Sequence, residues 1–176
     1  MRKKILIWVV PIIIIGCLTG PYKYNNENTI QYIKDHKHTA SRCMCAWYSM
    51  KAIRNGGCYY CYIYPGYAYN KVLLQLGFIE ISTENYIPKA GDISVLPKNS
   101  KSCFGHIAVY DGEHWVSDFE QRDIFPGRSY RLSGKYQIFR IEDGWHWAFI
   151  HPNLNDIYGY IEALISGFDR IKWSNL

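Results

Sequence analysis

Three side chains of this sequence, a cysteine, a histidine and an aspartate, are spaced so that they could hydrolyse an amide together. Cys45 lies where a helix is expected to begin, His106 opens an apolar strand, and Asp118 lies on the strand expected next. A nucleophile, a general base and an acid that orients the base are the groups that thiol-dependent acyl transfer requires. They occur in the segments SRCMCAWY (41–48), GHIAVYDG (105–112) and WVSDF (115–119).

The chemistry of these groups depends on where they stand in their elements. Cysteine attacks as the thiolate, and a helix N-terminus or a neighbouring histidine lowers the pKa of a thiol. The backbone N–H of Cys45, free in the first turn of its helix, can also help to bind an oxyanion. We therefore predict that Cys45 forms a thioester with the acyl group, which water then opens. His106 acts first as base and then as acid, and Asp118 fixes the histidine tautomer.

The predicted triad depends on the register of one hairpin. If Asp111-Gly112-Glu113 is a three-residue connection, His106 lies opposite Asp118 with their Cβ atoms roughly 5 Å apart. A two-residue Asp-Gly turn would instead place Ser117 opposite His106 and send Asp118 to the other face of the sheet. The catalytic prediction rests on the first register.

Each of these residues also has a common structural role. Taken alone, Cys45 could be a buried small residue or a disulfide partner, His106 a satisfied strand-edge histidine, and Asp118 a solvated acid. Together they favour catalysis, because all three lie at the starts or ends of elements and in the right order. Cys43 is the weaker candidate for the nucleophile, since it falls outside the helix.

The sequence contains six cysteines, and four of them offer an alternative metal site. Tetrahedral zinc can be held by four thiolates, here Cys43, Cys45, Cys58 and Cys61. Zinc would remove Cys45 from catalysis, however, and an exported chain would more readily form a Cys58–Cys61 or Cys43–Cys103 disulfide. We therefore expect neither a metal nor an organic cofactor.

The elements that must position these groups follow an α+β order. We expect a helix that Ser41 caps and Asn55-Gly56-Gly57 ends, a Tyr-, Cys- and Gly-rich loop, and a second helix stopped by Gly77. Antiparallel strands follow these helices, and helices first with strands second indicate an α+β fold. The second helix is expected over residues 67–76. The strands are expected over 78–81, 93–96, 107–110, 114–119 and 136–141, and a last helix over 157–165.

The first residues read as a targeting segment. A basic start precedes an apolar run, residues 5–15, that is short for a membrane span, and Ile14-Ile15-Gly16-Cys17 resembles the lipobox of bacterial lipoprotein signals. Cys17 would then be acylated, although an uncleaved anchor or an ordinary signal remains an alternative. Loss of residues 1–16 removes three positive charges and no acids, so the formal charge falls from +5 to +2. No basic patch is left to indicate a nucleic-acid partner.

Four of the segments resemble one family in both order and spacing. They are CAWYSMKAIRNGG (45–57), PKAGDI (88–93), GHIAVY (105–110) and WVSDF (115–119). They are similar to the cysteine helix, the turn before the first core strand, the histidine strand and the following strand of CHAP-type amidohydrolases, part of the papain-like clan of peptidoglycan hydrolases. The resemblance implies a papain-like core with the cysteine-bearing helix packed on an antiparallel sheet.

The resemblance also implies an activity, namely cleavage of peptidoglycan amides, either as N-acetylmuramoyl-L-alanine amidase or as peptidase. We expect a monomeric, exported enzyme of the cell envelope that contacts the membrane through its N-terminal segment. A non-catalytic wall- or peptide-binding lipoprotein on the same fold is the alternative. The expected division is a signal (1–17), a linker (18–40), a catalytic domain (41–142) and a C-terminal extension with an aromatic segment and a helix (143–176).

Overall fold

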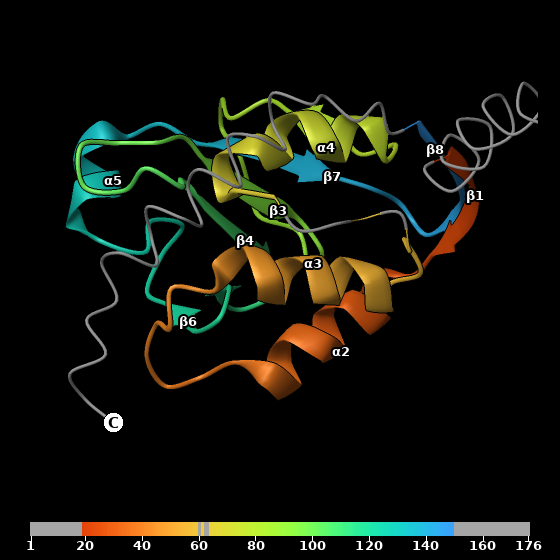
Figure 1. The fold of residues 1–176 in the computed structure, drawn as a ribbon, viewed down its shortest axis with the longest axis horizontal. Helices are drawn as coiled ribbons and strands as arrows, with labels where there is room; N and C mark the ends of the chain where they lie inside the picture. The colour runs from red at the N-terminus through yellow and green to blue at the C-terminus, as the bar shows by residue number, and fades with distance from the viewer. Residues whose placement is uncertain (1–18, 60, 62–63, 150–176) are drawn as a thin grey trace, which may run out of the picture.

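The computed structural model describes residues 19–149 except 60, 62 and 63, and in this part the chain forms a mixed helix and antiparallel-sheet fold (Figure 1). This confirms the expected α+β class. The helices are α2 (Asn26–His36), α3 (Cys45–Asn55), the 3-10 helix η1 (Gly66–Ala68), α4 (Tyr69–Gln75) and α5 (Arg128–Ser133). The strands are β1 (Thr19–Tyr24), β2 (Ile79–Ile81), β3 (Ile93–Leu96), β4 (His106–Tyr110), β5 (Trp115–Val116), β6 (Glu120–Gln121), β7 (Gln137–Arg140) and β8 (Gly144–Phe149).

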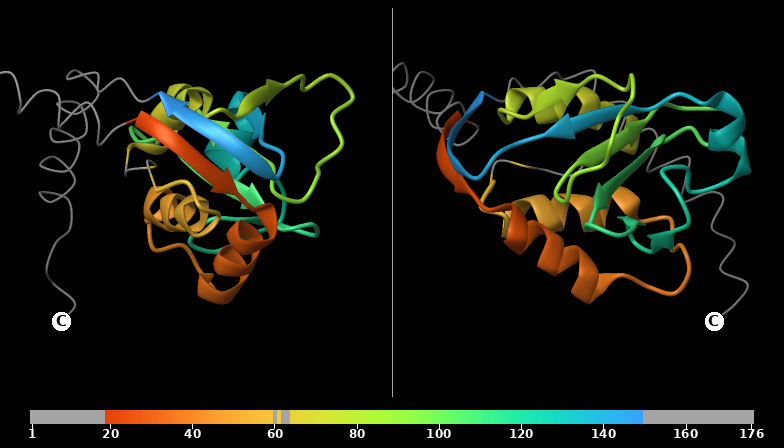
Figure 2. Two further views of the ribbon diagram at one scale, coloured as in Figure 1. Left: turned by 90° about the vertical axis from the view of Figure 1, so that its right-hand side faces the viewer. Right: turned by 180° about the vertical axis from the view of Figure 1, so that it is seen from behind.

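Six of these strands form the main sheet, in the order β2-β7-β3-β4-β5-β6, and every neighbouring pair is antiparallel. One face of the sheet packs against α3 and α4, and the strands lie nearer to the viewer than these helices when the molecule is seen from behind (Figure 2). Apolar side chains of β3 and β4 that alternate along the strands, such as Val95, Ile107 and Val109, enter this core beside Ile53 and Leu73 of the helices. The cysteine-bearing helix therefore lies against the histidine strand.

The expected linker is instead part of the fold. Residues 19–24 form β1, residues 26–36 form α2, and the side chains of Tyr22, Tyr24 and Ile33 are buried in the core. The sequence suggested a linker because aliphatic residues are few there. Tyrosines supply the buried positions of the strand at a spacing of two residues, which is the strand period.

The start of the expected C-terminal extension also belongs to the fold. β8 pairs with β1 in a separate two-stranded sheet, and Ala148 of β8 is buried in the core. The outward side chains of Trp145, Trp147 and Phe149 are exposed. The expected helix over 157–165 and the N-terminal segment with Cys17 both lie outside the described residues. Within the described part, no helix has the length and apolar composition needed to cross a membrane.

The hairpin between β4 and β5 takes neither of the registers considered from the sequence. Tyr110 pairs with Trp115 and Val109 with Val116, so the pairing is shifted by one residue from the register that the catalytic prediction assumed. The reason lies in Asp111, whose backbone N–H donates to the His114 carbonyl and whose carboxylate accepts from the N–H groups of Glu113 and His114. The connection is therefore a four-residue loop, and β5 ends before it reaches Asp118.

Asp92, after the predicted turn at Pro88–Gly91, joins the neighbouring strands β3 and β7 through an ion pair with Arg140. Its fully buried carboxylate accepts from Arg140 Nε at 2.6 Å and Nη2 at 2.8 Å, from the Tyr86 hydroxyl at 2.6 Å and from Lys89 N–H at 2.8 Å. Arg140 ends β7 and Asp92 precedes β3, so the pair closes the junction of these two strands.

Replacing Asp92 with alanine should lower the free energy of unfolding by about 3 kcal/mol, because the change leaves a partly buried guanidinium and a tyrosine hydroxyl without their acceptor. Urea denaturation of full-length variants measures the change. Glu142→Ala is the matched control, since Glu142 pairs with Lys89 at 3.0 Å on the surface, where such a pair contributes little. Equal stability losses for the two variants would contradict the assignment.

Candidate active site

Cys45 is the first residue of α3, as the sequence predicted. No side-chain hydrogen bond caps this helix and no acid lies in its first turn, and the backbone of Ala46 in that turn is hydrogen-bonded to the Cys45 thiol. Burial raises the pKa of the Cys45 thiol to about 11, against the opposing effect of a hydrogen bond from the backbone of Ile107. The thiol is therefore protonated at neutral pH and touches the residue next to His106.

Ser41 does not cap the helix as expected. The N-cap residue is Met44, and the Ser41 hydroxyl instead accepts from Cys43 N–H at 3.2 Å and donates to Asp118. Cys43 has a positive φ of 58° and is exposed before the helix begins. This position gives it no part in the helix N-terminus, which leaves Cys45 as the candidate nucleophile.

His106 is the first residue of β4, and its ring is buried, with 6% of the residue exposed. Burial lowers the pKa of the ring to about 4, and the negative charge of Asp118 opposes this effect. The imidazole is therefore neutral at pH 7, which is the form that can accept a proton. Tyr130 of α5 lies beside it, with the ring centroids 6.0 Å apart.

Gln121 is the group hydrogen-bonded to the histidine ring. Its amide nitrogen lies 2.8 Å from His106 Nε2 and 3.1 Å from the Ser117 hydroxyl, in a buried position on β6. Sequence reasoning missed this residue, because the chain reverses after β5 and returns as β6, with Trp115 paired to Gln121. The polar side chain of Gln121, two residues after the expected strand 114–119, was only a weak signal that this residue belongs to the site.

Asp118 lies in the turn between β5 and β6 and is fully buried. One carboxylate oxygen accepts from Arg42 N–H at 2.5 Å, Met44 N–H at 3.2 Å and the Ser41 hydroxyl at 3.3 Å. The other accepts from the Ser117 hydroxyl at 3.1 Å. In the described part of the chain Asp118 makes no hydrogen bond to His106, and acts on it only through its charge.

The structure therefore gathers the predicted residues at one end of α3, but with other contacts than those expected. The charge of Asp118 acts on both Cys45 and His106. Tyr130 packs on the His106 ring. Burial raises the pKa of the Tyr130 hydroxyl, and the charge that Cys45 carries as a thiolate adds to this effect. The helix that carries Tyr130, α5, was not predicted, and it covers the site at the same end of the molecule as the start of α3 (Figure 1).

The four cysteines considered as zinc ligands are divided between two places. Cys58 and Cys61 are buried in the main core, whereas Cys43 is exposed before α3. Among residues 19–149, apart from the three undescribed positions, no three His, Cys, Asp or Glu side chains are grouped as metal ligands.

An α+β fold with a cysteine at the N-terminus of a helix, packed on the antiparallel strand that carries a histidine, defines the papain-like amidase class. Two solved structures are similar to this chain, both of the type VI effector–immunity complex Tae3–Tai3 from Ralstonia pickettii. The native form is 32% identical over 68% of this chain and 100% of its own, with a TM-score of 0.63. The selenomethionine form is 32% identical over 64% and 98%, with a TM-score of 0.59.

The chain belongs to the Tae3 family of type VI effectors. No family model and no curated protein matches the sequence. The resemblance to CHAP-type amidohydrolases therefore stays a prediction, while the papain-like core that it implied is confirmed by the fold of Tae3.

Alkylation of Cys45 by iodoacetamide should accelerate about tenfold per pH unit between pH 7 and about pH 10, because only the thiolate reacts and burial raises the thiol pKa to about 11. Mass spectrometry of the Cys45 peptide in a Cys43→Ser background measures the rate. The exposed Cys103 of the same chain serves as the internal reference. A rate that reaches its plateau below pH 8 would show instead that the resting thiolate is paired with an imidazolium.

Proposed function

We propose that this protein hydrolyses amide bonds of peptidoglycan through a thioester on Cys45. The observation that carries the proposal is the position of Cys45, at an uncapped helix N-terminus and against the backbone of the residue that follows a buried, neutral histidine. Membership of the Tae3 family, a family of peptidoglycan hydrolases, supports the substrate class. The bond is either the muramic acid–L-alanine amide or a peptide bond of the stem.

The proposed reaction begins from the neutral pair. As the sulfur of Cys45 bonds to the carbonyl carbon, its proton passes to the ring of His106, and the carbonyl oxygen takes up the negative charge. The free N–H groups of the first turn of α3 stabilise this oxygen. His106 then protonates the leaving nitrogen as the C–N bond breaks. Water, deprotonated by His106, opens the thioester and releases a carboxylate and the Cys45 thiol.

Gln121 is proposed to orient the base. The two ends of a glutamine amide differ only in which atom faces the ring, and the orientation is set by the hydrogen-bond network. Gln121 Oε1 has no partner within the described chain when the nitrogen faces His106. Turning the amide lets Oε1 accept from His106 Nε2–H, and Nδ1 is then the nitrogen free to take the thiol proton.

Asp118 is proposed to act mainly on the position of Cys45 and less on His106. Its carboxylate binds two backbone N–H groups and one hydroxyl of residues 41–44, the turn that leads into Cys45. It therefore sets where the nucleophile helix begins, and its charge favours the imidazolium that forms during the reaction. This role replaces the direct contact with His106 that the expected register implied.

Export is proposed from the sequence of residues 1–17, with Cys17 as the acylation site. An exported hydrolase would meet its substrate in the cell envelope. The alternative of a non-catalytic wall-binding lipoprotein has less support. Buried titratable groups with shifted pKa values occur mainly at catalytic sites, and His106 is such a group, hydrogen-bonded to an amide.

The first test compares peptidoglycan digested by the protein and by its Cys45→Ala variant, with the products identified by mass spectrometry. We expect new fragments from the parent only, whose masses name the bond that is cut. Fragments from both proteins would exclude Cys45 as the nucleophile. Fragments from neither, with both proteins folded and bound to the wall, would support the binding protein instead.

Replacing Gln121 with alanine should lower kcat about 100-fold and leave KM nearly unchanged, since it removes the orientation of the base and not a substrate contact. Gln121→Glu should restore part of the rate, because its carboxylate can also accept from Nε2–H. Steady-state kinetics over pH 5–9 distinguish this role from a structural one, because the glutamate variant should shift the acidic limb of kcat upward. An unchanged kcat in the Gln121→Ala variant would contradict the proposed role of Gln121 in orienting His106.

A further inference from the structure

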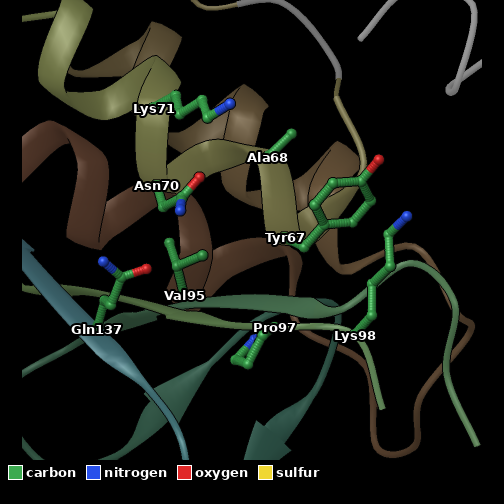
Figure 3. A pocket seen from close by; sticks show the side chains of 8 residues that line it. All are labelled: Tyr67, Ala68, Asn70, Lys71, Val95, Pro97, Lys98 and Gln137. Carbon is green, nitrogen blue, oxygen red and sulfur yellow. The ribbon is translucent and has the colours of Figure 1, made fainter. Parts of the chain in front are cut away.

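A hollow lies between η1 and α4 on one side and β3 and β7 on the other (Figure 3). Its volume is about 340 Å³, enough for one amino-acid residue or the end of a peptide. The catalytic argument uses none of its lining. The residues that form it are Tyr67, Ala68, Asn70, Lys71, Val95, Pro97, Lys98 and Gln137.

One wall of this pocket is built directly on the histidine segment. A Cβ at Gly66, which precedes the wall, would lie 2.9 Å from the backbone N, Cα and C of His106, so only glycine fits. Tyr67 N–H donates to the Phe104 carbonyl at 3.0 Å. Gly105, with φ of 65°, packs equally closely, because its Cβ would lie 2.7 Å from Tyr67 Cβ. The pocket therefore begins one residue from the contact with His106.

The same wall also reaches the nucleophile. Tyr69 follows Ala68 in the chain, and its hydroxyl lies 3.3 Å from the carbonyl oxygen of Ala46. Ala46 is the residue after Cys45. The four residues from Gly66 to Tyr69 thus span from the histidine strand to the first turn of α3, and two of them, Tyr67 and Ala68, line the pocket (Figure 3).

The charged side chains that line the pocket are both lysines. Lys98 Nζ lies 4.0 Å from the centroid of the Tyr67 ring, a cation–π contact that holds the ammonium at the pocket wall. Lys71 comes from the first turns of α4, and neither lysine forms an ion pair within the described chain. Asn70 and Gln137 add neutral amides, and Gln137 is held by Glu80 outside the lining at 3.0 Å.

We propose that this pocket binds a free carboxylate of the substrate peptide, with Lys98 and Lys71 as its cationic ligands. The inference rests on the proposed function for the identity of the peptide, but the pocket itself is independent of Cys45. Two ammonium groups without an ion-pair partner in the described chain, beside the amide of Asn70, suit a carboxylate, and the volume accommodates about one residue. The enzyme would then select peptides that carry a carboxylate next to the bond that is cut.

The test uses the full chain with Cys45→Ala, so that binding is measured without turnover. The probe is a synthetic peptide of alternating L- and D-residues ending in D-alanine, prepared once as the free acid and once as the C-terminal amide. Isothermal titration calorimetry should show the acid binding at least tenfold more tightly than the amide. Lys98→Gln should remove most of this difference, and Lys71→Gln part of it.

Lys51→Gln is the matched control, because Lys51 also lies over an aromatic ring, 5.0 Å from the Trp47 centroid, but outside the pocket. It should leave the preference for the acid unchanged. Equal affinity for acid and amide, no binding of either peptide, or an unchanged preference in the Lys98→Gln variant would each overturn the proposal, as would a loss in the control.

The two proposals fail separately. If the parent enzyme cuts the acid and the amide with the same KM, the pocket proposal is wrong while the hydrolase stands. If the Cys45→Ala chain prefers the acid through Lys98 but the parent chain cuts no peptidoglycan amide, the pocket stands and the hydrolase is wrong.

Discussion

The burial of the Asp118 carboxylate is the constraint on which the site depends. A buried charge is tolerated only when its oxygens are hydrogen-bonded, and here the partners are the N–H groups of Arg42 and Met44 together with two serine hydroxyls. Satisfying Asp118 therefore fixes the turn before α3, and that turn decides where the helix begins. Cys45, the candidate nucleophile, therefore owes its position to a residue more than seventy positions later in the chain.

Burial has a second effect at this site, because it keeps both reacting groups neutral. The thiol of Cys45 has its pKa raised to about 11 and the ring of His106 has its pKa lowered to about 4, each mainly by loss of solvent. An ion pair at rest is therefore disfavoured, and in the proposed mechanism charge is created only when the thiol proton moves to the ring. In the proposed reaction the N–H groups of α3 donate to the oxyanion, whereas the amide oxygen of Gln121 accepts from the charged ring.

Several features of the fold follow from local sequence and were predicted from it. The helix at Cys45–Asn55 and the strands at Ile93–Leu96 and His106–Tyr110 carry strong periodic patterns and clear stop signals, and the structure confirms them. The strand and helix at residues 19–36 were not predicted, because their buried positions are filled by tyrosines and a threonine as well as by isoleucine. Short elements such as β6 and α5 contain too few residues for a periodic signal.

The sequence by itself determined where the candidate nucleophile and base lie in their elements, since the start of α3 at Cys45 and of β4 at His106 is set by neighbours within a few residues. It also determined the α+β class, because the order of the periodic segments along the chain is enough for that. Only the tertiary structure decided which side chain is hydrogen-bonded to the histidine ring. That choice depends on the register of β4 and β5, which the Asp111 loop shifts by one residue, and on the reversal that returns Gln121 to the ring. Side chains alternate between the faces of a strand, so a shift of one residue changes every partner across the sheet.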